Sequence, residues 1–190
     1  MEIVYEYPLY RPPSEADSMI LQVTLGCSFS NCSFCNMYRT KEYAEWPWEE
    51  IKTKIDMAAK FYPDTRRVLL ADADALKLSK DRMIQILQYL NSKFPELKRV
   101  SCIAMPLNLL KKKDEELEEM RAAGLDMQYV GIESGSDIVL KKVTKGATYR
   151  TIVQACQKAK RHGYGLSCMV ILGLWGETYT KEHIAGTAGY

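Results

Sequence analysis

The stretch from residue 25 to residue 36 reads Leu25-Gly26-Cys27-Ser28-Phe29-Ser30-Asn31-Cys32-Ser33-Phe34-Cys35-Asn36, which places three cysteines within nine residues. Their spacing is Cys-x4-Cys-x2-Cys, and thiolates this close in sequence can converge on one metal centre. A structural zinc site usually takes four protein ligands, and no fourth cysteine or histidine stands nearby. Because an iron-sulfur cluster held by three cysteines leaves one iron open to an outside ligand, the loop predicts chemistry at an open iron.

Around this loop, short apolar runs alternate with helical patterns. The runs that predict buried strands are 19–25, 67–72, 100–104, 126–133 and 166–172. Apolar residues at helical spacing predict helices at 48–61, 80–94, 114–123, 136–143, 149–161 and 181–188. Strands that alternate with helices indicate an α/β fold with a parallel sheet and helices packed outside it. Since an eight-unit barrel needs roughly 250 residues, we expect a partial (β/α) barrel with five βα units.

The same patterns predict the domain organisation. Residues 1–18 are rich in proline and tyrosine and hold neither a helical nor a strand period, which predicts an irregular N-terminal arm. Residues 19–190 predict one partial-barrel domain, which we expect to be truncated at its C-terminus. The fifth strand would then be an open apolar edge.

Composition excludes little about partners. The chain has 190 residues, 47% hydrophobic, with a formal net charge of +2, which does not indicate nucleic acid or an anionic membrane as a partner. No signal peptide or membrane-spanning run is predicted, and we expect a cytoplasmic protein. Cys102, Cys156 and Cys168 are scattered through apolar stretches, which fits a reducing compartment and predicts core positions.

Cys27, Cys32, Phe34 and Cys35 resemble the cluster loop of radical S-adenosylmethionine (radical SAM) enzymes, with one residue more in the first gap than their commonest pattern, Cys-x3-Cys-x-aromatic-Cys. The resemblance covers about residues 21–177. Within it, residues 130–141 are similar to the oxygen-independent coproporphyrinogen oxidases and the methylthiotransferases. The family fold is a partial barrel of six units, of which this sequence supplies five.

The resemblance implies a mechanism and its partners. Cys27, Cys32 and Cys35 would ligate three irons of a [4Fe-4S] cluster, and the fourth iron would bind S-adenosylmethionine. Reductive cleavage would give a 5'-deoxyadenosyl radical that abstracts hydrogen from a substrate that the sequence does not identify. The electron would come from a donor such as flavodoxin or ferredoxin.

Strand ends carry the predicted cofactor contacts, because ligands of parallel α/β folds bind at the carboxyl ends of the strands. The resemblance implies S-adenosylmethionine contacts at Phe34, Asp72, Asp74, Glu133, Ser134, Ile171 and Gly173. The aspartates stand where the family has a glycine-glycine-acid motif that holds the methionine amino group. The fourth-strand pair would contact the ribose or the methionine end, and the fifth-strand pair would pack against adenine together with the aromatic residue of the cysteine loop.

Simpler interpretations stand beside these. The cysteines could form a non-catalytic zinc or iron-sulfur module, the aspartates could begin a helix, and the glycines could turn the chain. A carboxylate at Glu133 is costly to bury without a partner, which favours a place at the rim. The basic runs 111–113 and 158–162 would contact RNA in an RNA-modifying member of the superfamily, but such runs are more often solvated helix ends.

Overall fold

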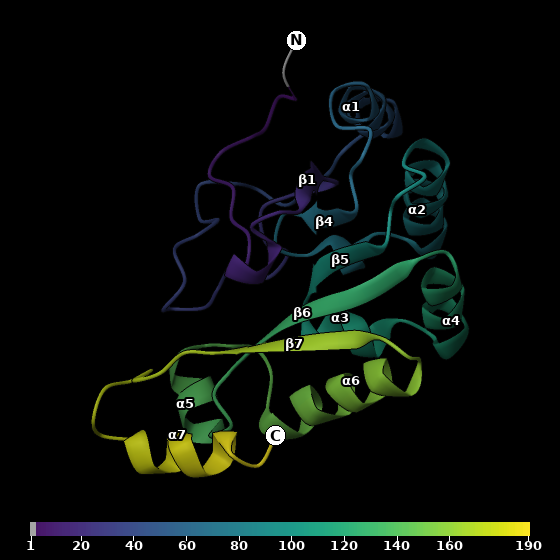
Figure 1. The fold of residues 1–190 in the computed structure, drawn as a ribbon. Helices are drawn as coiled ribbons and strands as arrows, with labels where there is room; N and C mark the ends of the chain where they lie inside the picture. Colours follow the sequence, from purple (N-terminus) through teal and green to yellow (C-terminus); the bar gives the residue numbers. More distant parts are fainter. Residues whose placement is uncertain (1–2) are drawn as a thin grey trace.

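A computed structural model describes residues 3–190, and a five-stranded parallel sheet forms its centre (Figure 1). The strand order is β1 (Met19–Gln22), β4 (Arg67–Ala71), β5 (Arg99–Ala104), β6 (Leu125–Glu133) and β7 (Gly165–Val170). The helices are α1 (Trp48–Phe61), α2 (Lys80–Lys93), α3 (Pro106–Lys111), α4 (Asp114–Ala122), α5 (Asp137–Lys142), α6 (Tyr149–Arg161) and α7 (Thr180–Thr187). Two 3-10 turns, η1 (Pro13–Glu15) and η2 (Ala75–Lys77), and a small antiparallel pair, β2 (Thr24–Leu25) with β3 (Ala44–Glu45), complete the elements. The parallel sheet and its alternation with helices confirm the predicted α/β partial barrel.

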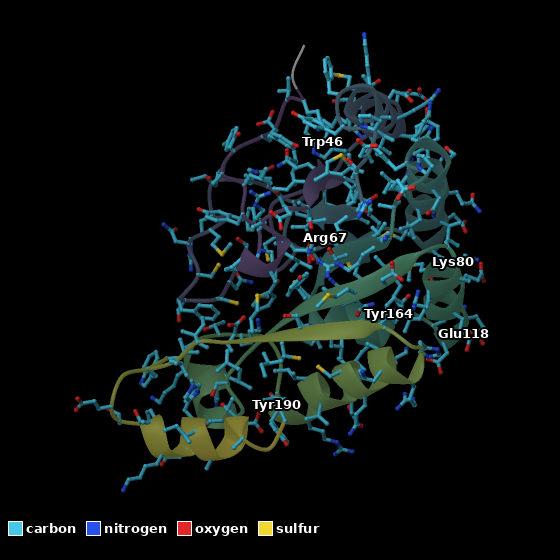
Figure 2. All side chains as sticks on the ribbon, in the orientation of Figure 1. Trp46, Arg67, Lys80, Glu118, Tyr164 and Tyr190 are labelled. Carbon is cyan, nitrogen blue, oxygen red and sulfur yellow. The ribbon has the colours of Figure 1, made fainter. Side chains whose placement is uncertain are left out.

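Apolar faces of the helices cover one side of the sheet. In Figure 1, α1, α2, α4 and α6 lie along one side of the curved sheet and the N-terminal arm lies on the other. In α1, Ile51, Ile55 and Ala58 are buried at helical spacing. Tyr164, labelled in Figure 2 just before β7, is also buried and donates its hydroxyl to the carbonyl of Leu117 in α4 (2.7 Å).

Two predicted strands end earlier in the structure, and one helix of the structure was not predicted. The run 19–25 is not one strand: β4 ends at Ala71, so the parallel ladder stops at Gln22 and the next residues pair with β3 instead. The predicted strand 166–172 ends at Val170. Helix α3 was not predicted, because six residues that begin with a proline offer too few positions for a period.

The edges of the sheet are β1 and β7. On β7, Val170 is 36% exposed, and Leu172 just beyond the strand is 88% exposed. Cys102 is buried as predicted, but the core prediction for Cys168 is wrong, because its side chain is exposed on this edge strand. Among the helices formed by residues 3–190, none is long and apolar enough to span a membrane.

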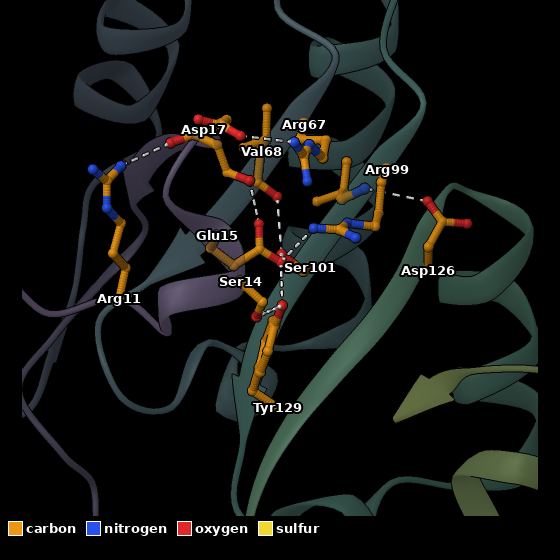
Figure 3. A network of polar contacts seen from close by, with 12 residues as sticks. Arg11, Ser14, Glu15, Asp17, Arg67, Val68, Arg99, Ser101, Asp126 and Tyr129 are labelled. Atoms are coloured by element: carbon orange, nitrogen blue, oxygen red, sulfur yellow. Dashed lines mark hydrogen bonds and ion pairs between the residues drawn. The ribbon is translucent and has the colours of Figure 1, made fainter. Parts of the chain in front are cut away.

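The N-terminal arm inserts a charged residue against the sheet (Figure 3). Turn η1 places the carboxylate of Glu15 at 0% exposure, where it accepts hydrogen bonds from Tyr129 (2.6 Å), Ser101 (2.9 Å) and the guanidinium of Arg99 (2.9 Å). The hydroxyl of Ser18 donates to the second carboxylate oxygen. A buried carboxylate with this many donors ties the arm to β5 and β6.

Helix α7 packs against the loop between β6 and α5. A Cβ built on Gly135 would lie 2.1 Å from the backbone carbonyl of Gly186, so the two backbones touch. The amide of Gly135 donates to the hydroxyl of Thr187 (2.9 Å), and the buried ring of His183 is 2.8 Å from the hydroxyl of Ser134. The absence of a side chain at Gly135 is therefore what lets α7 reach this loop.

Glu15→Ala should lower the free energy of unfolding by about 3 kcal/mol at neutral pH, because it leaves buried donors and Arg99 without their carboxylate. Burial raises the pKa of the Glu15 carboxyl, but the hydroxyl bonds and Arg99 outweigh this and lower it. Because its pKa is lowered in the folded state, the Glu15 carboxylate stabilises the fold at a pH above the unfolded pKa of about 4.3. This contribution to stability is lost as the pH falls through the folded pKa. Urea unfolding of both proteins should therefore show a difference that shrinks below about pH 4.

The control is Asp17→Ala, which removes an ion pair to Arg67 from a carboxylate that is 84% exposed. Its cost should stay below about 1 kcal/mol. Equal losses in the two variants would contradict the assignment of Glu15 as the residue that anchors the arm.

Gly135→Ala should lower the free energy of unfolding by about 1–3 kcal/mol, because the new methyl group overlaps the backbone of α7. Hydrogen exchange of the α7 amides should accelerate in the same variant. Gly165→Ala is the matched control, since its Cβ would find no neighbour closer than 3.5 Å. If α7 exchanges at the wild-type rate in Gly135→Ala, the close backbone contact does not hold the helix.

Candidate functional site at the carboxyl ends of the strands

The cysteine loop begins at Gly26, which is held by a buried carboxylate. Asp72 follows β4, and its Oδ2 accepts from the amide of Gly26 (3.0 Å) and from the ammonium of Lys41 (2.9 Å). Its Oδ1 accepts from the side-chain amide of Gln22 (3.0 Å). Gly26 has a φ of +66°, a conformation that glycine adopts without strain. Asp72 therefore joins the ends of β1 and β4 to the start of the loop, and protein donors engage both of its oxygens.

The turn that carries the second and third cysteines is held by Arg39. Its guanidinium donates to the carbonyls of Cys32 and Cys35, both at 2.8 Å. The amide of Cys35 also donates to the carbonyl of Cys32 (3.2 Å). The thiols of Cys27, Cys32 and Cys35 are free and half-buried.

The far side of the loop rests on the segment that follows α5. The amide of Ser33 donates to the carbonyl of Val143 (3.0 Å). The ring of Phe29 lies on Gly146, where a Cβ would come within 2.4 Å of the ring. The φ of Gly146 is +73°. Contacts from β4 on one side and from the α5–α6 connection on the other thus fix the loop in place.

A small apolar cluster brings two predicted positions together. Phe34 and Ile171 both pack against the buried side chains of Val139, Val143 and Leu174. These positions come from the cysteine loop, from α5 and from the segment after β7, which are far apart in the sequence. Gly173, also predicted, lies in an exposed turn with a φ of +70°, and a Cβ there would meet nothing within 4 Å.

Asp74 has an oxygen without a partner. Its side chain is fully buried, and its Oδ2 accepts from the amide of Asn108 (2.6 Å) and from the hydroxyl of Ser28, the neighbour of Cys27. Its Oδ1 is buried and has no hydrogen-bond partner among residues 3–190. Burial raises the pKa of this carboxyl, although the bonds from Ser28 and Asn108, the charge of Lys77 and the backbone amide of Met105 act to lower it. A cationic donor would complete the group.

Glu133, at the end of β6, forms an ion pair with Lys145. Its Oε1 lies 2.9 Å from the Lys145 ammonium, and the two side chains are only 11% and 10% exposed. Glu133 has a φ of +59°, which is uncommon for a residue other than glycine. A Cβ on Gly131 would lie only 2.2 Å from the Glu133 carboxylate. Glycine at position 131 therefore leaves room for this carboxylate. Glu133 is thus buried with a partner, as its cost of burial requires.

Several ionisable groups act on the thiol of Cys32. Burial raises the pKa of its thiol, and the charge of Lys145 acts in the opposite direction. Cys27, Cys35 and Glu133 raise it further, which places all of these groups within electrostatic reach of Cys32. Over residues 3–190, no three cysteine, histidine or acidic side chains converge closely enough to hold a single metal ion. The three cysteines stay predicted ligands.

The structure therefore brings Phe34 together with Ile171 and Asp74 together with the cysteine loop, and it adds residues that were not predicted. Ser134 is buried beneath α7, and its hydroxyl accepts from the amide of Ser136 (3.1 Å). Sequence patterns did not single out Lys145, Asn108 or Arg39. Each stands outside a recognisable motif, and only its contacts with the loop or the rim reveal it.

A cleft of about 750 Å³ lies elsewhere, against the N-terminal arm. Its lining includes Tyr5, Arg11 and Met19 from the arm and β1, and Arg67 from the start of β4. It therefore lies at the amino ends of these strands and contains none of the predicted site residues. The cysteine loop, Asp74 and Glu133 stand at the opposite, carboxyl ends of the strands.

Comparisons with known proteins agree with this geometry. Residues 21–188 match the model of the radical SAM superfamily. The cobalamin-dependent S-adenosylmethionine radical enzyme OxsB, solved with aqua-cobalamin and S-adenosylmethionine bound, superposes with a TM-score of 0.69 at 23% identity, over 88% of this chain and 26% of that one. Methylornithine synthase (PylB) gives 0.66 at 18% identity, over 90% of this chain and 49% of that one. Coproporphyrinogen III oxidase (HemN) from Escherichia coli gives 0.64 at 15% identity, over 90% and 40%.

The chain spans between 26% and 49% of the length of these three structures. No protein of curated function matches the sequence. The likeness to solved structures confirms the fold, and the match over residues 21–188 decides the family. The chain belongs to the radical SAM superfamily, an enzyme superfamily whose members bind a [4Fe-4S] cluster and S-adenosylmethionine.

Proposed function

We propose that this protein is a radical SAM enzyme in which Cys27, Cys32 and Cys35 hold three irons of a [4Fe-4S] cluster. The observation that carries the proposal is the cysteine loop: its three thiols are free and half-buried, and Ser28, the neighbour of Cys27, bonds the buried carboxylate of Asp74. When bound, the cluster and S-adenosylmethionine supply reductive cleavage to a 5'-deoxyadenosyl radical, which abstracts hydrogen from substrate. The chain's own residues bind, orient and shield these groups.

The donor set of the loop fits a cluster. Three thiols on one loop can each take a different iron, whereas a structural zinc ion would need a fourth ligand. The backbone around the thiols is already fixed, because Arg39 bonds the carbonyls of Cys32 and Cys35 and Asp72 bonds the amide of Gly26. Assembly would then order three side chains rather than the whole loop, which reduces its entropic cost.

Asp74 is the residue that we propose for the methionine amino group. An ammonium is a donor without acceptors, so it suits a carboxylate oxygen that lacks a partner. Ser28 and Asn108 hold the other oxygen and thereby fix the carboxylate next to Cys27. Asp72 was predicted for the same role, but three protein donors already bond its oxygens. We propose that Asp72 positions the loop instead.

The remaining predicted contacts would form the nucleoside side of the site. Phe34 and Ile171 share one apolar cluster, which offers a surface on which adenine can pack. We propose Gly173 in the turn beyond adenine. The hydroxyl of Ser134 already bonds His183 and Ser136, so we propose that Ser134 holds α7 against the rim instead of contacting the ribose. The electron would come from a small donor such as flavodoxin or ferredoxin, and free thiols suit a cytoplasmic location. The substrate is a molecule with a hydrogen that this radical can abstract.

Single replacements Cys27→Ala, Cys32→Ala and Cys35→Ala should each abolish cleavage of S-adenosylmethionine by the anaerobically reconstituted protein. Each variant lacks one of the three protein ligands of the cluster. Cleavage is measured as 5'-deoxyadenosine formed, and cluster content by electron paramagnetic resonance of the reduced protein. Cys168→Ala, an exposed thiol on β7, is the control and should behave as wild type. Cleavage retained in all three variants, or wild-type protein that takes up zinc alone, would overturn the proposal.

Asp74→Asn should weaken S-adenosylmethionine binding about tenfold or more, because it removes a charge-assisted hydrogen bond to the amino group. Binding is followed by the change that the ligand causes in the resonance signal of the reduced cluster. Asp81→Asn, whose side chain is 91% exposed on α2, is the matched control and should leave the affinity unchanged. Wild-type affinity in Asp74→Asn with a complete cluster would assign Asp74 a structural role.

A further inference from the structure

Cys156 in α6 and Cys168 in β7 are two thiols that the proposed chemistry does not use. The register partner of Cys168 on β6 is Val130, which belongs to the core between the sheet and the helices. Side chains of register partners lie on the same face of a sheet, so Cys168 stands on the face that α6 covers. Cys156 packs against the same core from the side of the helix. The fold thus brings the two thiols together between α6 and the edge strand.

A cleft of about 510 Å³ opens over both cysteines. Cys168 is exposed and Cys156 is half-buried. Lys160 and Arg161, from the last turn of α6, line the same cleft, as does Tyr190, which is labelled in Figure 2. A cleft that offers two thiols beside two cations suits a small molecule that carries carboxylates and reacts with sulfur.

The two thiols differ in reactivity. Hydrogen bonding from Cys156 lowers the pKa of the Cys168 thiol to about 7, although burial acts to raise it. The same bond and burial raise the pKa of the Cys156 thiol. The thiolate is the form that attacks a disulfide, and the attack is fastest when the pKa lies near the ambient pH. Cys168 is therefore suited to attack first, and Cys156 is suited to follow.

We propose that Cys168 and Cys156 form a thiol–disulfide exchange site for a small anionic disulfide of the glutathione type. The thiolate of Cys168 attacks one sulfur of this disulfide, which forms a mixed disulfide and releases the other half as a thiolate. The thiol of Cys156 then gives up its proton and attacks the sulfur of Cys168, which closes a disulfide between the two residues and releases the second half. The protein thiols lose two electrons and two protons, and the external disulfide takes them up to become two thiols.

The exchange needs neither the cluster nor S-adenosylmethionine, so it goes beyond the proposed function. Both cysteines stand outside the cysteine loop. Their disulfide would tie β7, an edge of the sheet, covalently to α6.

The test treats the whole reduced chain with glutathione disulfide under anaerobic conditions and then blocks the remaining thiols with N-ethylmaleimide. Modified residues are identified by mass spectrometry after digestion with trypsin. Trypsin cleaves after Lys158, between the two cysteines, so their disulfide appears as two joined peptides, which wild-type protein should yield. Cys102, which is buried, should react at least about tenfold more slowly than Cys168. The three cysteines of the loop lie on another peptide and do not enter the result.

Two variants separate the roles of the thiols. Cys156→Ala should stop the reaction at a mixed disulfide on Cys168. In this variant, the pH at which the rate is half-maximal should rise from about 7 toward about 8.5, because the hydrogen bond from the second thiol is lost. Cys168→Ala should slow the modification of Cys156 about tenfold or more.

The role of charge is tested with a second disulfide. Lys160→Gln combined with Arg161→Gln should slow the reaction with glutathione disulfide about threefold or more. The same variant should react with the neutral hydroxyethyl disulfide at the wild-type rate. Equal slowing with both compounds would contradict the preference for an anionic disulfide.

Wild-type protein that stops at the mixed disulfide, or that forms none on Cys168, would overturn the proposed site. Equal rates at Cys102 and Cys168 would overturn it as well. If Cys156→Ala does not fold, the joined peptides of the wild-type protein carry the test.

Discussion

The carboxylate of Asp72 is the point on which the arrangement of the site depends. It stands where β4 leaves the sheet, and it accepts hydrogen bonds from the side chain of Gln22, the amide of Gly26 and the ammonium of Lys41. These donors come from the end of β1 and from the two ends of the cysteine loop. With 0% exposure, the charge has no water to compensate it, so the three donors cannot leave without a large cost. A buried carboxylate thereby ties the start of an otherwise irregular loop to the sheet.

A second set of contacts holds the cysteine loop on its opposite side. The connection between α5 and α6 contacts the loop through Ser33 and Phe29, and α5 itself carries the cluster that receives Phe34. The strands of the sheet thus contribute to the site through the segments at their carboxyl ends. This is the general logic of parallel α/β folds, in which the carboxyl ends of the strands converge on one rim.

Charge at this rim is arranged in two different ways. Glu133 has its cation within the protein, whereas Asp74 keeps one buried oxygen without a partner among residues 3–190. The first arrangement is paired within the protein, and the second leaves a carboxylate oxygen free to accept. The difference supports our proposal that Asp74, and not Asp72, receives the cofactor's amino group. In the N-terminal arm, Glu15 is held by protein donors of β5 and β6 in the same way as Asp72, and it fixes the arm to the sheet.

The sequence by itself determined the class of fold and the family. Helical and strand periods are local patterns, and helices at 48–61 and 149–161 were predicted to the residue. Cys27, Cys32 and Cys35 stand in one local motif, so the sequence alone carried the resemblance to the family. Tertiary structure decided which polar groups meet. Lys145, Asn108 and Arg39 reach their partners across 12, 34 and 4–7 residues, respectively. It also gave Asp72 and Asp74 different partners, although the two residues are alike and only two positions apart. The role of a carboxylate depends on which hydrogen-bond donors the folded chain brings to it.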